Sequence, residues 1–313
     1  MPAAAPDDLL AAARGGDRGA LARLISLIER GGDAARRVGR ASHGLGIDAS
    51  TVGITGAPGA GKSTLTSALL DVVRAGGDPV AVLAVDPSSP FSGGALLGDR
   101  VRMGEHALDD GVFIRSMATR GHLGALAVAA PEAVRVLAAA GYPWVILETV
   151  GVGQVEIDVV AQADTTVVVV TPGWGDAVQA NKAGLMEIAD LFVVNKADRT
   201  GADDTARDLE RMLDMSPATD WRPPVLCTTA TTGAGVAEVW QAVVDHRAHL
   251  AAGGELQDRR RRRAAEEVTR LVAARLLDKA RAVTAGPRAA ELAEAVARGE
   301  VDPWTAAEEL LGE

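Results

Sequence analysis

The hydrophobic residues follow a helical period near the N-terminus and a strand-like pattern in the middle of the chain. Leu21, Leu24, Ile25 and Ile28 lie at helical spacing and predict a helix that stops at Gly31-Gly32. From about residue 50, short apolar runs alternate with helix-length segments. These runs are TVGIT (51–55), PVAVLAV (79–85), PWVILE (143–148), TTVVVVT (165–171), LFVVN (191–195) and PPVLCT (223–228). Such runs indicate a mainly parallel sheet covered by helices, and GVFIR (111–115) is a weaker seventh candidate.

Beyond residue 252 the strand-like runs stop and the helical period returns. A long helix is predicted from an apolar stripe made of Val268, Leu271, Val272 and Leu276. A second helix is expected over 288–298, and DPWTAAEELL starts another, with Asp302 as its N-cap and Pro303 in its first turn. The stripe has to be buried, either on the chain's own sheet or on a second subunit.

This pattern divides the chain into three parts. We expect an N-terminal helical extension (1–48), an α/β domain (49–252) and a C-terminal helical segment (253–313). The 313 residues are 48% hydrophobic and 24% charged, which suits one large core with appendages.

The composition indicates which cellular compartment and which classes of binding partner to expect. The start, MPAAAPDDLL, is acidic where a signal peptide is basic, and no apolar run approaches the ~18 residues of a membrane span, so we expect a cytoplasmic protein. Cys227 is the only cysteine, which excludes an intrachain disulfide. The net charge of −10 argues against nucleic acid. For the basic run Arg259–Arg263, a solvated helix face is favoured over an anion site.

The stretch GAPGAGKST combines a strand, a glycine-rich turn and a helix. It matches GxxxxGK[ST] in the context that this motif requires, and so predicts a P-loop. The residues expected to bind the phosphates are Gly56, Ala57, Pro58, Gly59, Ala60, Gly61, Lys62, Ser63 and Thr64. Backbone N–H groups and the helix N-terminus attract the phosphates, Lys62 reaches the β- and γ-phosphates, and the Ser63 hydroxyl is a Mg²⁺ ligand.

Two later stretches predict which base is bound. Asn195, Lys196 and Asp198 form NKxD at the end of a buried strand. The Asp198 carboxylate can accept hydrogen bonds from N1–H and the exocyclic amine of guanine, donors that adenine lacks on this edge, so GTP and GDP are expected rather than ATP. The backbone of the next loop, at Thr229, Ala230 and Thr231, is expected near guanine O6.

The run VILETVGVGQ ends a buried strand in a carboxylate and two glycines. Glu148 must therefore face something charged, and the glycines allow the turn to reorder. The alternative is a carboxylate that caps the following helix.

With these motifs in order, the chain resembles the methylmalonyl-CoA mutase-associated GTPases, the MeaB/ArgK-like family. Further matching stretches are VDPSSPFSGGALLGDRVRM (85–103), RSMATRGHLG (115–124) and PGWGDAVQANKAGLMEIAD (172–190). The resemblance implies a P-loop GTPase domain with helical extensions that form a homodimer. It also implies a GTP-hydrolysing chaperone of an adenosylcobalamin-dependent acyl-CoA mutase, which gates cofactor loading and protects or reactivates the mutase.

The resemblance also implies roles for single residues. Asp86 and Asp99 would lie in a first switch near Mg²⁺, and Glu148 would hold the metal side of a second switch. Gly151 would contact the γ-phosphate through its N–H, and Gln154 would lie near the attacking water, so that Lys62, Glu148 and Gln154 are the expected catalytic residues. The third switch, which faces the mutase, would contain Asp176, Gln179 and Lys182.

Two other functions remain open. A kinase of an amino-acid transport system would need a phosphoacceptor site and a preference for ATP. A metal-inserting GTPase would need clustered Cys and His ligands, which one cysteine and five scattered histidines do not supply. Arg115 and Arg120 are the candidates for an arginine finger.

Overall fold

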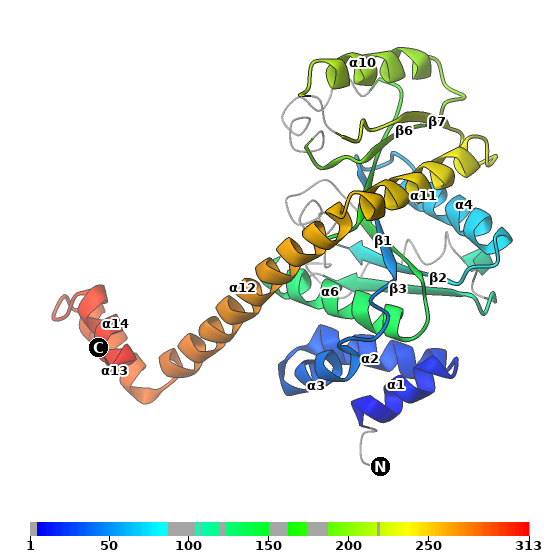
Figure 1. Cartoon of the computed structure of the whole chain (residues 1–313). Coiled ribbons are helices and arrows are strands. Elements are labelled where there is room, and N and C mark those ends of the chain that lie inside the picture. Colours follow the sequence, from blue (N-terminus) through cyan, green and yellow to red (C-terminus); the bar gives the residue numbers. More distant parts are fainter. Residues whose placement is uncertain are drawn as a thin grey trace. The chain divides into compact units, whose positions relative to one another are not determined.

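The computed structural model describes residues 5–86, 104–106, 108–118, 123–149, 162–173, 187–217 and 220–312. For residues 86, 118 and 123–128 it describes the backbone only. In this part of the chain an α/β sheet domain is preceded and followed by helices (Figure 1).

The sheet has seven strands in the order β3-β2-β4-β1-β5-β6-β7, and the neighbouring strands pair in parallel. The strands are β1 (Ser50–Gly56), β2 (Val80–Asp86), β3 (Val112–Ala118), β4 (Trp144–Thr149), β5 (Thr165–Val170), β6 (Leu191–Asn195) and β7 (Val225–Thr228). The predicted parallel sheet is confirmed, and GVFIR is indeed a seventh strand, at one edge.

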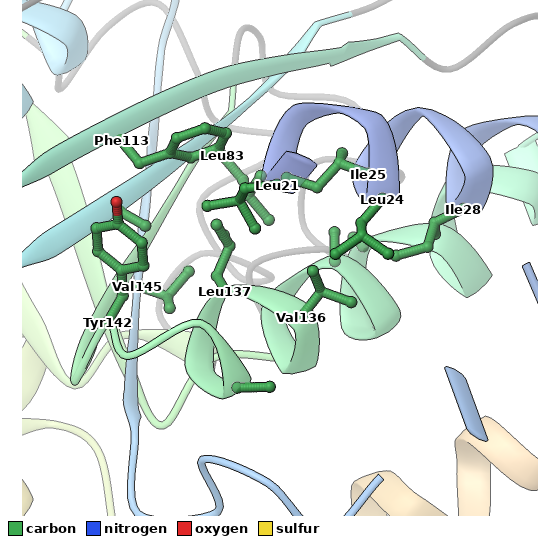
Figure 2. Packing of buried hydrophobic residues seen from close by; sticks show 14 of the residues in the cluster. Leu21, Leu24, Ile25, Ile28, Leu83, Phe113, Val136, Leu137, Tyr142 and Val145 are labelled. Carbon is green, nitrogen blue, oxygen red and sulfur yellow. The ribbon is translucent and has the colours of Figure 1, made fainter. Parts of the chain in front are cut away.

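One face of the sheet is covered by α6 (Leu123–Ala139) and the N-terminal helices α1 (Pro6–Arg14), α2 (Arg18–Arg30) and α3 (Gly32–Ser42). Figure 2 shows the apolar face of α2, from Leu21 to Ile28, against Val136 and Leu137 of α6. Phe113, Leu83 and Val145 of the sheet complete this core. The predicted N-terminal helix is therefore part of the core.

The other face is covered by α4 (Lys62–Ala75) and α11 (Val236–Ala252). Alternate residues of one strand reach opposite faces, as strand geometry requires: Val145 and Leu147 join the first core, while Trp144 and Ile146 join the second. A smaller core forms where α10 (Ala202–Asp214) covers β5 and β6. Both faces are buried, which explains the near-continuous apolar strands.

The chain divides into two compact units, residues 1–260 and 261–313. The long helix α12 (Glu255–Thr284) begins in the first unit and continues into the second, which also contains α13 (Pro287–Ala297) and α14 (Pro303–Leu311). The Asp302 carboxylate accepts hydrogen bonds from the N–H groups of Trp304 and Thr305, so the predicted N-cap is confirmed. Within the described ranges, no helix combines the length and the apolar character that crossing a membrane requires.

Candidate functional site

The predicted nucleotide-binding residues that the structure describes lie at the carboxyl ends of β1, β4, β6 and β7. In a parallel sheet these ends share one edge, and ligands of open α/β folds bind there. Residues that are far apart in the sequence therefore come together. The edge carries the phosphate loop after β1, Glu148 in β4, Asn195 at the end of β6 and Thr229 after β7.

Backbone geometry explains two glycines of the phosphate loop. Gly56 has φ 140°, and a Cβ atom placed there would lie 2.0 Å from the carbonyl oxygen of Val169. Gly61 has φ 90°, and its Cβ would lie 2.4 Å from Nδ2 of Asn195. A side chain at either position would clash with a neighbouring segment. The loop thus lies tightly between β5 and the NKxD segment.

Lys62 is the first residue of α4 and is buried. Its Nζ donates hydrogen bonds to the carbonyl oxygens of Gly56, at 2.6 Å, and Ala57, at 3.2 Å. The ammonium group is therefore held against the loop, beside the N-terminus of α4 with its positive end of the helix dipole. This combination of charges suits a polyphosphate.

Ser63 and Glu148 bring two oxygen donors together beside the phosphate loop. Ser63 Oγ donates to Glu148 Oε1 at 2.5 Å, and Glu148 is fully buried. The end of β4 is also fixed to β1, because Thr149 Oγ1 lies 3.3 Å from both the Ile54 carbonyl oxygen and Thr55 Oγ1. Mg²⁺ prefers oxygen ligands and is usually bound by one or two protein groups together with substrate phosphates, so this donor set fits a magnesium ion.

Asn195 joins three segments of the site. Its Nδ2 donates to the Ala60 carbonyl oxygen at 2.8 Å, and its Oδ1 accepts from Thr228 Oγ1 and from the Ala230 N–H, each at 3.2 Å. Lys196 has a left-handed φ of 60° and donates from Nζ to the Gly59 carbonyl oxygen at 2.7 Å. The NKxD loop is thus tied to the phosphate loop by two side chains.

Asp198 follows this anchor in an exposed turn. The turn is ordered by two backbone hydrogen bonds, from the Ala197 N–H to the Thr228 carbonyl oxygen and from the Arg199 N–H to the Lys196 carbonyl oxygen. The exposed position leaves the Asp198 carboxylate open to a base, which the predicted role requires.

In the loop after β7, two of the N–H groups expected near guanine O6 already donate to acceptors within the chain. The Thr229 N–H donates to the Ala234 carbonyl oxygen at 3.0 Å, and the Ala230 N–H donates to Asn195. An O6 contact from Ala230 would therefore share its N–H with Asn195, while Thr231 is exposed at the tip of the same loop. Thr228 was not among the predicted site residues, although a hydroxyl in the last position of a strand that leads to this loop was a usable signal.

Several predicted residues lie outside the part of the chain that the structure describes. They are Asp99, Gly151, Gln154, Asp176, Gln179 and Lys182, together with the Asp86 side chain and Arg120. Arg115 is described, and it donates to Glu29 Oε2 at 2.7 Å and to Ser26 Oγ at 3.0 Å, both on α2. This ion pair occupies Arg115 on the face of the sheet that α2 covers, which disfavours it as an arginine finger.

The family model of the methylmalonyl-CoA mutase-associated GTPase MeaB matches this chain over residues 21–285. A protein of Pyrococcus abyssi, named as a GTPase, is 48% identical over 98% of this chain and 96% of its own length. The mouse methylmalonic aciduria type A homolog, a mitochondrial protein, is 38% identical over 67% of this chain and 52% of its own.

Among solved structures, one described as an LAO/AO transport system kinase covers 98% of this chain and 96% of its own, with a TM-score of 0.72 and 28% identity. The similarity spans both compact units of the present chain. The P-loop and the NKxD segment thus occur in a fold that a known structure shares nearly end to end.

Proposed function

The chain belongs to the family of methylmalonyl-CoA mutase-associated GTPases and is a GTPase, and from this premise we propose that it is a chaperone of an adenosylcobalamin-dependent acyl-CoA mutase. In this proposal, GTP hydrolysis gates the loading of the cofactor and protects or reactivates the mutase. The observation that carries it is the family match over residues 21–285, which includes the P-loop and NKxD as well as all of α12. The name of the mouse relative, which refers to methylmalonic aciduria, supports the same client class.

Within the site, the chain's own residues divide the work of hydrolysis. Lys62 and the loop N–H groups bind the phosphates, and Asn195 holds the base-binding loop in place while Asp198 selects guanine. Ser63 and Glu148, with Asp86 and Asp99, would hold Mg²⁺, which when bound neutralises charge on the β- and γ-phosphates. Gly151 would contact the γ-phosphate, and Gln154 would orient the attacking water.

The third switch connects this site with the client. Asp176, Gln179 and Lys182 follow β5 and belong to no part of the usual P-loop machinery, so their proposed task is to report the nucleotide state to the mutase. Any difference in mutase affinity between the GTP and GDP forms is a coupling free energy, and it acts in both directions.

The test uses a purified methylmalonyl-CoA mutase and the full-length GTPase. We expect the mutase to raise the GTP hydrolysis rate and to bind with an affinity that differs between GDP and a non-hydrolysable GTP analogue. Asp176→Ala and Lys182→Ala should lower this stimulation while nucleotide affinity, measured by calorimetry, stays near that of the wild type. A mutase that neither binds nor stimulates would refute this client, and a normal response of both variants would refute the third switch.

A kinase acting on a transport system is the second candidate, because the similar solved structure carries that description. A kinase requires a protein or small-molecule acceptor for the γ-phosphate. Incubation with γ-labelled GTP and ATP distinguishes the two functions: we expect labelled inorganic phosphate from GTP and no labelled acceptor. Label transferred from ATP to a transport protein would favour the kinase.

A further inference from the structure

A cluster of buried charges lies at the amino ends of β5 and β6, on the edge of the sheet opposite the nucleotide site. Asp164 and Asp190 each directly precede one of these strands, and their side chains are only 3% and 11% exposed. Their cationic partners are Arg259 and Arg260, two consecutive residues near the start of α12. The prediction of a solvated helix face is therefore wrong for these two arginines.

Arg260 fixes the start of β1. It donates to Asp164 Oδ2 at 2.8 Å and to the carbonyl oxygens of Ile47, at 2.6 Å, and Ala49, at 2.7 Å. Asp164 in turn exchanges hydrogen bonds with Thr51 in β1: Asp164 Oδ2 accepts the Thr51 N–H at 3.2 Å, and Thr51 Oγ1 accepts the Asp164 N–H at 2.7 Å. The Arg260 guanidinium group thus binds the residues that lead into β1. It also binds the Asp164 carboxylate, which is itself hydrogen-bonded to β1.

Arg259 fixes the start of β5 in a similar way. Its Nη1 donates to Asp190 Oδ1 at 3.0 Å and to the Asp164 carbonyl oxygen at 3.3 Å. Asp190 Oδ2 accepts the Thr166 N–H of β5 at 2.8 Å. Burial raises the pKa of Asp190, while Arg259 and the Thr166 N–H favour its charged form.

The two strands held in this way are the ones that meet at the phosphate loop. β1 ends at Gly56, the first glycine of the loop, and Gly56 pairs with Val169 near the end of β5. The contact there is tight, since a Cβ atom on Gly56 would lie 2.0 Å from the Val169 carbonyl oxygen. A shift of β1 against β5 at one edge would therefore change the shape of the loop at the other, because a packed sheet transmits strain.

Stability alone is a weak reason for such a cluster. Replacing a buried ion pair by apolar residues often leaves stability unchanged or improves it, so the presence of these pairs is weak evidence that they serve stability. Here the pairs specify the relative position of two strands and attach both to one helix.

We propose that Arg259 and Arg260 are positioning residues of the phosphate loop, which hold β1 and β5 in the arrangement that binds nucleotide. Because coupling between sites is reciprocal, nucleotide in the loop stabilises the first turns of α12. The stability of the first turns of α12 thus depends on whether nucleotide is bound.

The experiment compares Arg259→Met and Arg260→Met in the full-length protein with Arg262→Met. Arg262 is an exposed arginine of the same helix and serves as the matched control. We expect each of the first two variants to bind GDP and a non-hydrolysable GTP analogue about tenfold more weakly by calorimetry, which corresponds to about 1.4 kcal/mol. The control should stay within about twofold. Arg260→Lys, which retains the charge, should recover part of the affinity.

Amide hydrogen exchange supplies a readout that a purely structural anchor would not change. In the wild type, the GTP analogue should slow exchange of the amides of residues 256–260, and this effect should disappear in the methionine variants. Variants with a lower melting temperature but unchanged nucleotide affinity would overturn the proposal. Should the variants fail to fold, wild-type exchange in this segment that is the same with and without nucleotide would overturn it as well.

Discussion

Asp198 and Glu148 differ in burial, so substitutions can test their proposed roles one at a time. Asp198 is exposed in a turn, where we propose that it binds the base, so its replacement leaves the core intact. Glu148 is fully buried and is bonded by Ser63, so its replacement must keep a hydrogen-bond acceptor. A substitution of Asp198 therefore tests base selection, and a substitution of Glu148 tests metal binding.

Asp198→Asn should weaken GTP binding on the order of a hundredfold, because two charge-assisted hydrogen bonds to guanine are lost, each worth roughly 1.5–3 kcal/mol. Xanthine carries an oxygen where guanine carries its amine, so the asparagine amide can donate to it. The variant should thus gain affinity for xanthosine triphosphate while it loses affinity for GTP. Calorimetry with both nucleotides checks this, and a variant that binds GTP like the wild type contradicts the assignment.

Glu148→Gln should lower the rate of GTP hydrolysis by about two orders of magnitude, the usual effect of removing one electrostatic group from an active site. The amide oxygen still accepts from Ser63, so the melting temperature should change little. GDP affinity in the presence of a chelator should also be unchanged, whereas the Mg²⁺ concentration for half-maximal hydrolysis should rise. Full activity at low Mg²⁺ would exclude Glu148 from the metal site.

At the scale of elements, the apolar pattern was sufficient to find all seven strands. The inner strands β1, β4, β5 and β6 are buried throughout, whereas the edge strand β7 is only partly buried. The apolar pattern did not predict α3, which begins directly after the turn that ends α2. Gly31 and Gly32 have φ 72° and 69°, so they end α2 as expected, but α3 begins at once and packs its own residues on the core. The contacts of Arg259 and Arg260 with the sheet could not be predicted either, since they join residues 69 to 213 positions apart.

For the site, the motifs located the phosphate loop, Glu148 and Asn195, because each lies at a strand end in a recognisable order. The hydrogen bonds that position them were not predictable. Thr228 and Ala60 bond with Asn195 only because β6 and β7 are neighbours and the phosphate loop folds over this edge. Spacing along the sequence contains no such information.

The packing of α11 on the sheet predicts a dependence of stability on pH. His246 of α11 is fully buried, its Nδ1 lies 2.9 Å from Thr165 Oγ1, and its Nε2 lies 3.3 Å from Asp190 Oδ1. Burial, with the nearby Arg259, lowers the pKa of His246 from 6.5 to about 3. Between these two values the unfolded chain binds a proton that the folded chain does not, so stability falls as the pH drops below 6.5.

From pH 7.5 to 5.5 this one group should reduce the free energy of unfolding by about 1.4 kcal/mol. His246→Gln keeps polar atoms near Thr165 and Asp190 but does not titrate, so its stability should change less over the same range. Urea unfolding of both proteins at the two pH values measures the difference. Equal pH dependence in the two proteins would show that His246 is not the responsible group.

At the scale of the whole molecule, the second unit exposes a row of apolar side chains on α12. On α12, Val268, Val272 and Leu276 are 60%, 52% and 59% exposed, and Val283 continues the same face. Val268, Val272 and Leu276 are spaced by about one helical turn and belong to the predicted apolar stripe, whose fourth residue, Leu271, is half-buried. An exposed apolar stripe of this length is typical of a surface that binds another protein chain.

We propose that a second copy of this chain covers the stripe, as the family resemblance also implies, and that the protein is a homodimer. Val272→Glu and Leu276→Glu each place a charge in the stripe and should convert the dimer into a monomer. Light scattering should then give 32.1 kDa in place of twice that mass. Because nothing in the sheet is changed, the GTP dissociation constant should stay within about twofold of the wild type.

Arg281→Glu is the matched control for this experiment. Arg281 is exposed, and it lies two residues from Val283, which is about 200° around the helix and so on the side opposite the stripe. The control should therefore remain dimeric at the concentration at which the two stripe variants dissociate. A wild-type protein that is monomeric at micromolar concentration would refute the homodimer. Stripe variants that stay dimeric would show that a different surface of the chain joins the two copies.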